Sequence, residues 1–235
     1  MNAATPPLDL SKSVVYLLID SHNFVSKILT TTQASTAGKI VAAAERRMRE
    51  SGFHGFSFRD IAADVGIKSA SVHHHFPTKE DLGAAVAQAY TKRMMEALGD
   101  PKDPQRSPEA LIGLYVDGYR QAMQKGKGRT TCLGGVIACE LASLPNHVAR
   151  AGAEFFEQSA AWLEAVLRRR SPEAKPETIQ AQAIRIVALL QGGTLIAKAL
   201  RRKDDREIDA RIMGRSRVPL RVTVAHSRSP STRRR

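Results

Sequence analysis

The stretch SFRDIAADVGIKSASVHHHF (Ser57–Phe76) decides the fold of this chain. Ser57 and Asp60 have the spacing of a capping box, in which two side chains accept hydrogen bonds from backbone N–H groups at a helix start. Gly66 ends this first short helix, and a second short helix over 68–76 follows. Two short helices joined by a glycine-containing turn predict a helix-turn-helix. The residues predicted to form the buried face of the first helix are Ile61, Ala62 and Val65.

The second short helix carries the small polar and basic side chains that suit a DNA major groove, which is about 12 Å wide. Val72 and Phe76 are expected to point back into the domain, which leaves the polar face outward. Ser57 and Arg59, at the start of the first helix, are candidate phosphate contacts. The candidate DNA-binding residues of the second helix are Lys68, Ser69, Ser71, His73 and His74.

The stretches SFRDIAADVGI (Ser57–Ile67) and SASVHHHFPTKEDL (Ser69–Leu82) closely resemble the DNA-binding domain of TetR-family transcriptional regulators. The resemblance is dense over 36–98. It implies an all-α fold, with a three-helix helix-turn-helix domain followed by a helical domain for effector binding and dimerisation. It also implies that His73 stands where the family usually has a phosphate-contacting Tyr. Residues 107–200 resemble the family only in helical outline and in the Cys-Leu-Gly-Gly stretch at 132–135.

Lys79 matches the phosphate-contacting Lys of that family at the start of the next helix. A lysine there opposes the helix dipole, which is easier to explain if a phosphate lies nearby. The alternative is a solvated residue at a helix start.

Composition limits the class of protein. The chain has 235 residues, of which 43% are hydrophobic and 5% aromatic, and this balance favours helices. Two cysteines exclude a disulfide scaffold and favour a reducing compartment. No uninterrupted apolar run approaches the roughly 20 residues of a bilayer span, and no secretion signal is recognisable, so we expect a cytoplasmic protein without a membrane partner.

Four segments are predicted. An extension (1–34) precedes the DNA-binding domain (35–98), which is followed by the effector and dimerisation domain (105–203) and a basic low-complexity tail (204–235). The net charge of +13 is a weak indicator of nucleic-acid binding, because residues 201–235 alone hold 12 Lys and Arg against four Asp and Glu. The predicted helices span 36–51, 57–65, 68–76, 78–98, 107–125, 131–143, 146–170 and 176–200, with Thr36 capping the first. The tail is either a functional basic arm or a non-native terminus.

The last predicted helix is apolar over a wide arc and must be covered on more than one side. Gly192 and Gly193 would let another helix approach it closely.

Cys132 and Cys139 are seven residues apart, which predicts a shared helix face. Cys132 follows Lys125, Lys127 and Arg129 near a helix start, a setting that lowers a thiol pKa. It is therefore a candidate redox or electrophile sensor, with Cys139 a weaker one. The alternative is that both are small core residues.

Two further groups leave alternatives open. Trp162, with Phe155 and Phe156, belongs to the core or lines an effector cavity. The consecutive histidines 73–75 diverge by about 100° each along a helix, so a shared metal site is not expected, and His75 is expected to pack or cap. We expect no metal and no cofactor.

These observations predict a homodimeric regulator, not an enzyme. It would repress transcription until a small molecule or a reactive electrophile or oxidant releases it from a near-palindromic double-stranded DNA operator. One alternative is a thiol-dependent enzyme using Cys132, for which His147 is the only histidine of the C-terminal helical domain. The other is a nonspecific nucleic-acid binder acting through the basic tail.

Overall fold

A computed structural model describes residues 35–125 and 132–199 of the chain. Within that part, the protein consists of eight α-helices and one short 3-10 helix, without a strand, and the predicted all-α class is confirmed. The helices are α2 (Thr36–Ser51), α3 (Phe58–Val65), α4 (Ser69–His75), α5 (Lys79–Leu98), α6 (Pro108–Lys125), α7 (Leu133–Glu140), η1 (Leu141–Ser143), α8 (Asn146–Arg170) and α9 (Pro176–Ala199). The predicted extension (1–34) and basic tail (204–235) lie outside the described residues.

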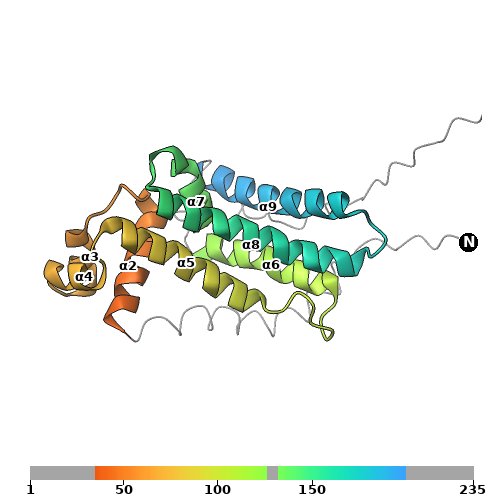
Figure 1. Cartoon of the computed structure of the whole chain (residues 1–235), viewed down its shortest axis with the longest axis horizontal. Helices are drawn as coiled ribbons and strands as arrows, with labels where there is room; N and C mark the ends of the chain where they lie inside the picture. The colour runs from red at the N-terminus through yellow and green to blue at the C-terminus, as the bar shows by residue number, and fades with distance from the viewer. Residues whose placement is uncertain (1–34, 126–131, 200–235) are drawn as a thin grey trace, which may run out of the picture.

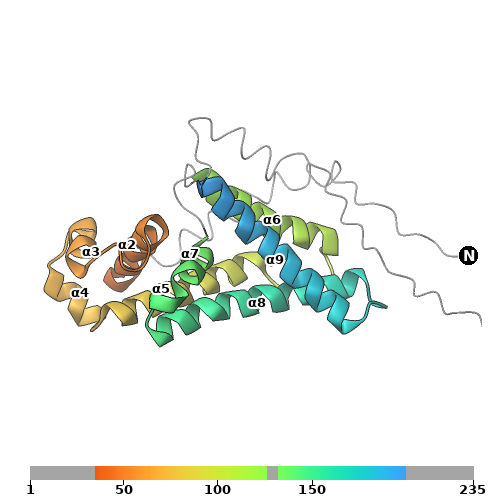
Figure 2. The ribbon, with the colours of Figure 1, turned by 90° about the horizontal axis from the view of Figure 1, so that it is seen from above.

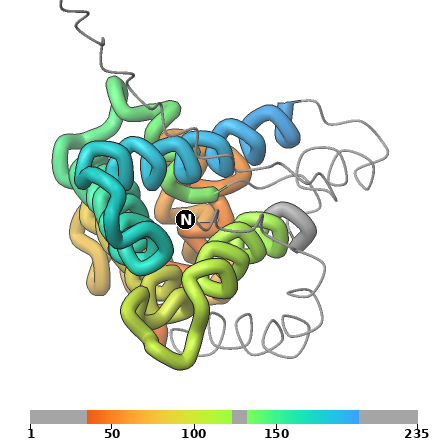
Figure 3. The backbone as a smooth tube through the Cα atoms, turned by 90° about the vertical axis from the view of Figure 1, so that its right-hand side faces the viewer, coloured from red at the N-terminus to blue at the C-terminus, as the bar shows by residue number. Residues whose placement is uncertain are grey.

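The helices form an elongated bundle with α3 and α4 at one end (Figure 1). The long helices α5 and α8 run along the molecule, and α7 lies beside α2 and α8 (Figure 2). Figure 3 views the molecule from the end opposite α3 and α4, where α6, α8 and α9 lie. The helix-turn-helix is therefore presented at one tip, away from α6 and α9.

Side-chain caps define the helix starts at this tip. Ser57 and Asp60 form the predicted capping box at α3, and Gly66 ends that helix with φ of +75°. The first helix differs from the prediction, because Ser35 rather than Thr36 caps α2 by accepting a hydrogen bond from the backbone N–H of Gly38 at 3.0 Å. Ser and Thr are both good caps, so the sequence alone did not distinguish the two neighbours.

Two hydrophobic clusters fill the bundle. The first lies under the helix-turn-helix and includes Ile40, Ile61 and Val72. The second lies between α6, α8 and α9 and includes Tyr115 and Leu163. The clusters do not follow the predicted domain limits strictly, because the first also takes in residues of α7 and α8 and the loop between them: Leu133, Ile137, Leu144, Val148 and Ala151.

Helix α9 buries one face and exposes another. Its exposed face includes large apolar side chains, with Ile184 at 52%, Leu189 at 65% and Ile196 at 54% exposure. Among the described helices, α9 alone is long and apolar enough to cross a membrane by length and composition, and 39% of its most apolar window is buried. Core helices of soluble proteins pass the same test, and α9 packs on α8 and α6. The other described residues leave these apolar side chains of α9 uncovered.

Candidate nucleic-acid interface

Helix α4 is held at the tip of the molecule by one fully buried anchor. Val72 is 0% exposed and belongs to the first hydrophobic cluster, and Phe76 packs against the same cluster, as predicted. Lys68, His73 and His74 are exposed, while Ser69 and Ser71 are half-buried. Anchoring one face of α4 therefore leaves its other face open to a duplex.

His73 lies against the start of α3 instead of projecting freely. Its ring centroid is 4.6 Å from that of Phe58, with the planes at 64°. The exposed imidazole is thus supported from below and can present a hydrogen-bond donor at a defined place. His75 does not pack or cap, contrary to the expectation. It is exposed at the last position of α4, with its ring 5.4 Å from that of His74.

The candidate residues at the start of α3 differ in how free they are. The Ser57 hydroxyl donates to Asp60 Oδ2 at 2.7 Å and accepts from the backbone N–H of Asp60 at 3.3 Å. The hydrogen bond from this hydroxyl is the main reason that the pKa of Asp60 is lowered. Arg59 is exposed. Arg59 can therefore reach a phosphate directly, whereas Ser57 chiefly shapes the helix start.

Lys79 is half-buried at the start of α5, and its ammonium rests on two aromatic rings. Lys79 Nζ lies 4.9 Å from the centroid of Phe53 and 4.6 Å from that of Phe56. These distances are typical of a cation–π contact. Burial lowers the pKa of Lys79. The side chain is thus preorganised at the tip instead of being freely solvated.

No pattern in the sequence predicted the ion pairs between α3 and α2. Asp64 on α3 accepts hydrogen bonds from both Arg46 and Arg47 on α2. Both arginines lie on the solvent side of α2 and reach Asp64 from there, so they help to hold the first helix of the helix-turn-helix in place.

The candidate effector residue Cys132 lies in a buried polar cluster. Its side chain is 3% exposed, and it is the residue before the first turn of α7. Tyr90 Oη donates to Cys132 Sγ at 3.4 Å, and Gln191 Nε2 lies 3.3 Å from the same sulfur and 3.0 Å from Tyr119 Oη. Burial raises the pKa of both tyrosines well above its usual value. The cations Lys127 and Arg129 lie outside the described residues.

Gln191 was missed by sequence reasoning, because it stands in the predominantly apolar stretch 186–197 of α9. Its side chain is buried, and Gln191 Oε1 has no hydrogen-bond partner among the residues that the structure describes. A buried amide oxygen without a partner is costly. Tyr90, Tyr119, Cys132 and Gln191 therefore form a buried polar cluster beside the second hydrophobic cluster.

The other effector candidates lie elsewhere. Cys139 is exposed on α7, so the two thiols do not share an environment. Cys132 precedes the first turn of α7 with a non-helical backbone, so the seven-residue spacing does not place the two cysteines on one helix face. Trp162 is a core residue: its Nε1–H donates to Gly99 O at 2.8 Å, and its ring stacks on Tyr115 with centroids 5.9 Å apart.

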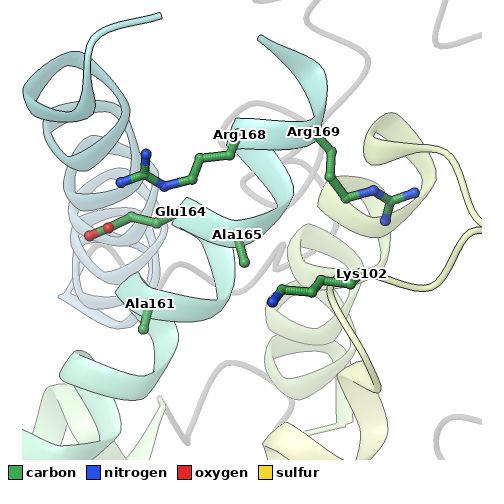
Figure 4. A pocket seen from close by; sticks show the side chains of 6 residues that line it. All are labelled: Lys102, Ala161, Glu164, Ala165, Arg168 and Arg169. Carbon is green, nitrogen blue, oxygen red and sulfur yellow. The ribbon is translucent and has the colours of Figure 1, made fainter. Parts of the chain in front are cut away.

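An open hollow of about 640 Å³ lies on α8 and the α5–α6 linker (Figure 4). It is lined by Lys102, Ala161, Glu164, Ala165, Arg168 and Arg169. Arg169 donates to the carbonyl oxygens of Pro101 and Arg106, both at 2.7 Å, and so braces the linker. The hollow includes none of the predicted site residues. In the described ranges, no three His, Cys, Asp or Glu side chains converge on a place that could hold a metal ion.

Residues 40–86 match the family described as bacterial regulatory proteins, tetR family. A crystal structure of a TetR transcriptional regulator from Legionella pneumophila is 31% identical, with a TM-score of 0.68 over 78% of this chain and 98% of that one. The HTH-type transcriptional regulator CymR of Pseudomonas putida is 43% identical over 47 residues, or 20% of this chain and 23% of CymR.

The HTH-type transcriptional repressor KstR2 of Mycobacterium tuberculosis is 29% identical over 86 residues, or 36% of this chain and 43% of KstR2. The chain thus matches less than half the length of these two curated relatives.

Proposed function

Since the chain belongs to the TetR family of DNA-binding transcriptional regulators, we propose that it binds a near-palindromic operator as a homodimer and represses transcription until an effector releases it. The observation that carries the proposal is the exposed polar face of α4, anchored by the buried Val72 at the tip of the bundle. Two such helices, one from each subunit, would enter successive major grooves about 34 Å apart.

The proposed contacts divide into two kinds. Side chains of α4 and its flank would read bases and neighbouring phosphates: Lys68, Ser69, Ser71, His73 and His74. Ser57, Arg59 and Lys79 would position the protein on the phosphate backbone. Base contacts give sequence preference, whereas phosphate contacts give affinity for any duplex.

The experiment is selection of bound fragments from a random pool of DNA duplexes by the full chain. The expected result is a near-palindrome whose half-sites are about one helical turn apart. Removal of residues 204–235 should leave that preference intact and reduce only the salt-sensitive background. The proposal would be refuted in favour of a nonspecific binder if the selection enriched no common sequence. It would also be refuted if removal of residues 204–235 abolished all DNA binding.

The exposed face of α9 supports the homodimer. Ile184, Leu189 and Ile196 are large apolar residues open to solvent on α9, the helix that also carries Gly192. A Cβ added at Gly192 would meet nothing within 4 Å, so packing within the subunit does not require a glycine there. A glycine at this position would, however, allow a helix of a second subunit to approach closely.

We propose that the effector acts on the cluster around Cys132. This cluster belongs to the second half of the bundle, away from α4, and it offers a thiol, two buried phenols and the unpartnered Gln191 oxygen. An effector can weaken DNA binding only if it binds one conformer more tightly than another. A small molecule would do so by hydrogen bonding within the cluster, and an electrophile by forming a bond to Cys132 Sγ with loss of the thiol proton.

A further inference from the structure

The C-terminal end of α7 is tied to the loop that precedes the helix-turn-helix. Glu140 Oε2 accepts a hydrogen bond from the backbone N–H of Phe53 at 2.8 Å, although the two residues are 87 positions apart. Gly52 makes this approach possible: a Cβ at that position would lie 1.8 Å from Glu140 Oε1, and its φ of +79° also favours glycine. The carboxylate thus occupies the space that a side chain at position 52 would need.

Phe53, which donates this hydrogen bond, also packs against residues of the DNA-binding tip. Its ring is 4% exposed and packs so closely on α5 that a Cβ at Gly83 would come within 2.6 Å of it. The ring of Phe56 lies edge-on to it, with centroids 6.3 Å apart. These two rings are the platform beneath the ammonium of Lys79. The position of Phe53 therefore affects where Lys79 is presented.

Helix α7, which carries Glu140, is packed tightly against α8. A Cβ at Gly134 would lie 2.4 Å from the ring of Phe155, and a Cβ at Gly152 would lie 2.3 Å from Ile137. Helices α7 and α8 are therefore closely packed, with a side chain of each against a glycine of the other, and sliding α7 along α8 would break these contacts. Because α7 starts next to Cys132 and ends at Glu140, it connects the polar cluster to Phe53.

We propose that Glu140 is a positioning residue for DNA binding, which places Lys79 by holding the loop of Gly52–Phe56. The inference rests on the phosphate contact proposed for Lys79. It assigns to Glu140 no contact with DNA. The role depends on the hydrogen bond that the carboxylate accepts, so an amide oxygen in the same place should serve.

The test is a double-mutant cycle on the full chain, with the duplex selected from the random pool and dissociation constants from fluorescence anisotropy at several salt concentrations. Glu140→Ala should weaken binding about tenfold in the native background but less than about twofold in Lys79→Ala, because the two changes remove one contact. Glu140→Gln should stay within about twofold of the native protein, because its amide oxygen can still accept from Phe53. Glu157→Ala, at an exposed acid on α8, is the matched control for the change in charge.

The outcomes are distinguishable. Native-like binding by Glu140→Ala, or the same loss with and without Lys79, overturns the role of Glu140. Native-like binding by Lys79→Ala instead refutes the phosphate contact within the proposed function. If urea unfolding shows that Glu140→Ala is not folded, Glu140→Asp replaces it in the double-mutant cycle with Lys79→Ala. This variant shortens the side chain by one methylene, and the same two outcomes would overturn the role of Glu140.

Discussion

Asp64 on α3 holds Arg47 on α2 by a two-point ion pair. Arg47 Nε lies 2.8 Å from Asp64 Oδ2, and Arg47 Nη2 lies 2.8 Å from Asp64 Oδ1. Arg46 Nη2 adds a third hydrogen bond at 2.8 Å. The planar guanidinium suits this paired geometry, which makes such a contact stronger than a typical surface ion pair.

Asp64→Ala should lower the free energy of unfolding by about 1 kcal/mol, after allowance for solvent screening of partly exposed charges. The reason is that two arginines lose their acceptor and α3 loses its fastening to α2. Urea unfolding followed by circular dichroism measures the change. Glu96→Ala is the control, because its exposed pair with Lys92 at 3.9 Å should contribute almost nothing. Equal midpoints for the two variants would contradict the role of Asp64.

The same contact predicts a dependence on acid. The hydrogen bond from Arg47 holds the pKa of Asp64 at about 2, against an ordinary value of 3.8. A carboxyl with a lowered pKa in the folded state stabilises the protein above its unfolded pKa and loses this effect as the pH falls through the folded value. The stability difference between the native protein and Asp64→Asn should therefore be constant above pH 5 and shrink between about pH 4 and 2. A difference that grows on acidification would show that the sign is wrong.

Lys79→Ala and Ser71→Ala should affect DNA binding differently. Loss of Lys79 removes a phosphate contact, so binding should weaken for every sequence and the salt dependence should fall by about one ion. Loss of the Ser71 hydroxyl should change the preference among sequences at one position. Competition anisotropy with variant duplexes measures both. Lys102→Ala removes the same charge at the hollow on α8 and should bind DNA as the native protein does. If Lys102→Ala weakened binding as much as Lys79→Ala, the effect of Lys79 would be due to net charge alone.

Leu189→Glu should break the proposed homodimer. A charge at a residue that is 65% exposed costs the subunit little, but it would be unpaired if that face is covered by a second copy. Analytical ultracentrifugation should show monomers, and affinity for the full palindrome should fall at least tenfold, because the half-sites are then bound independently. Gln105→Glu, in the exposed α5–α6 linker, controls for the added charge. A dimer that persists in Leu189→Glu places the interface elsewhere.

N-Ethylmaleimide should release DNA from the Cys139→Ser variant but not from Cys132→Ser. Alkylation of Cys132 inserts a bulky group among Tyr90, Tyr119 and Gln191, where the thiol is 3% exposed. Cys139 is exposed and should react faster without affecting binding. Mass spectrometry of the modified chain, alongside anisotropy, assigns the effect to one thiol. Release from Cys132→Ser would transfer the sensor role to Cys139, and the absence of release in both would argue for a noncovalent effector.

The helices were predictable because local signals agree. The Ser57–Asp60 capping box, the apolar spacing of Ile61 and Ala62, and the stop at Gly66 all favour the same α3. The predicted limits of most helices agree with the structure to within one or two residues. The cap at Ser35 instead of Thr36 shows where such signals are degenerate.

The contacts between distant residues were not predictable. Gln191 is 59 positions from Cys132, and Glu140 is 87 from Phe53, so no periodicity within one helix links either pair. The burial of Cys132 depends on helices that close over it from both directions along the chain. The candidate DNA-binding residues could be proposed from the sequence only because they lie within one short motif, whereas the roles of Arg46 and Arg47 required tertiary structure.

The first hydrophobic cluster is shared between the DNA-binding domain (35–98) and residues of α7 and α8. A fragment ending at Leu98 would keep every helix of the recognition unit but would lose Leu133, Ile137, Leu144, Val148 and Ala151 from its interior. It would expose the apolar underside of α2 and α5 to water. The DNA-binding domain (35–98) is therefore not an independent folding unit. A chimera that joins it to another protein would have to include α7 and the first turns of α8 as well.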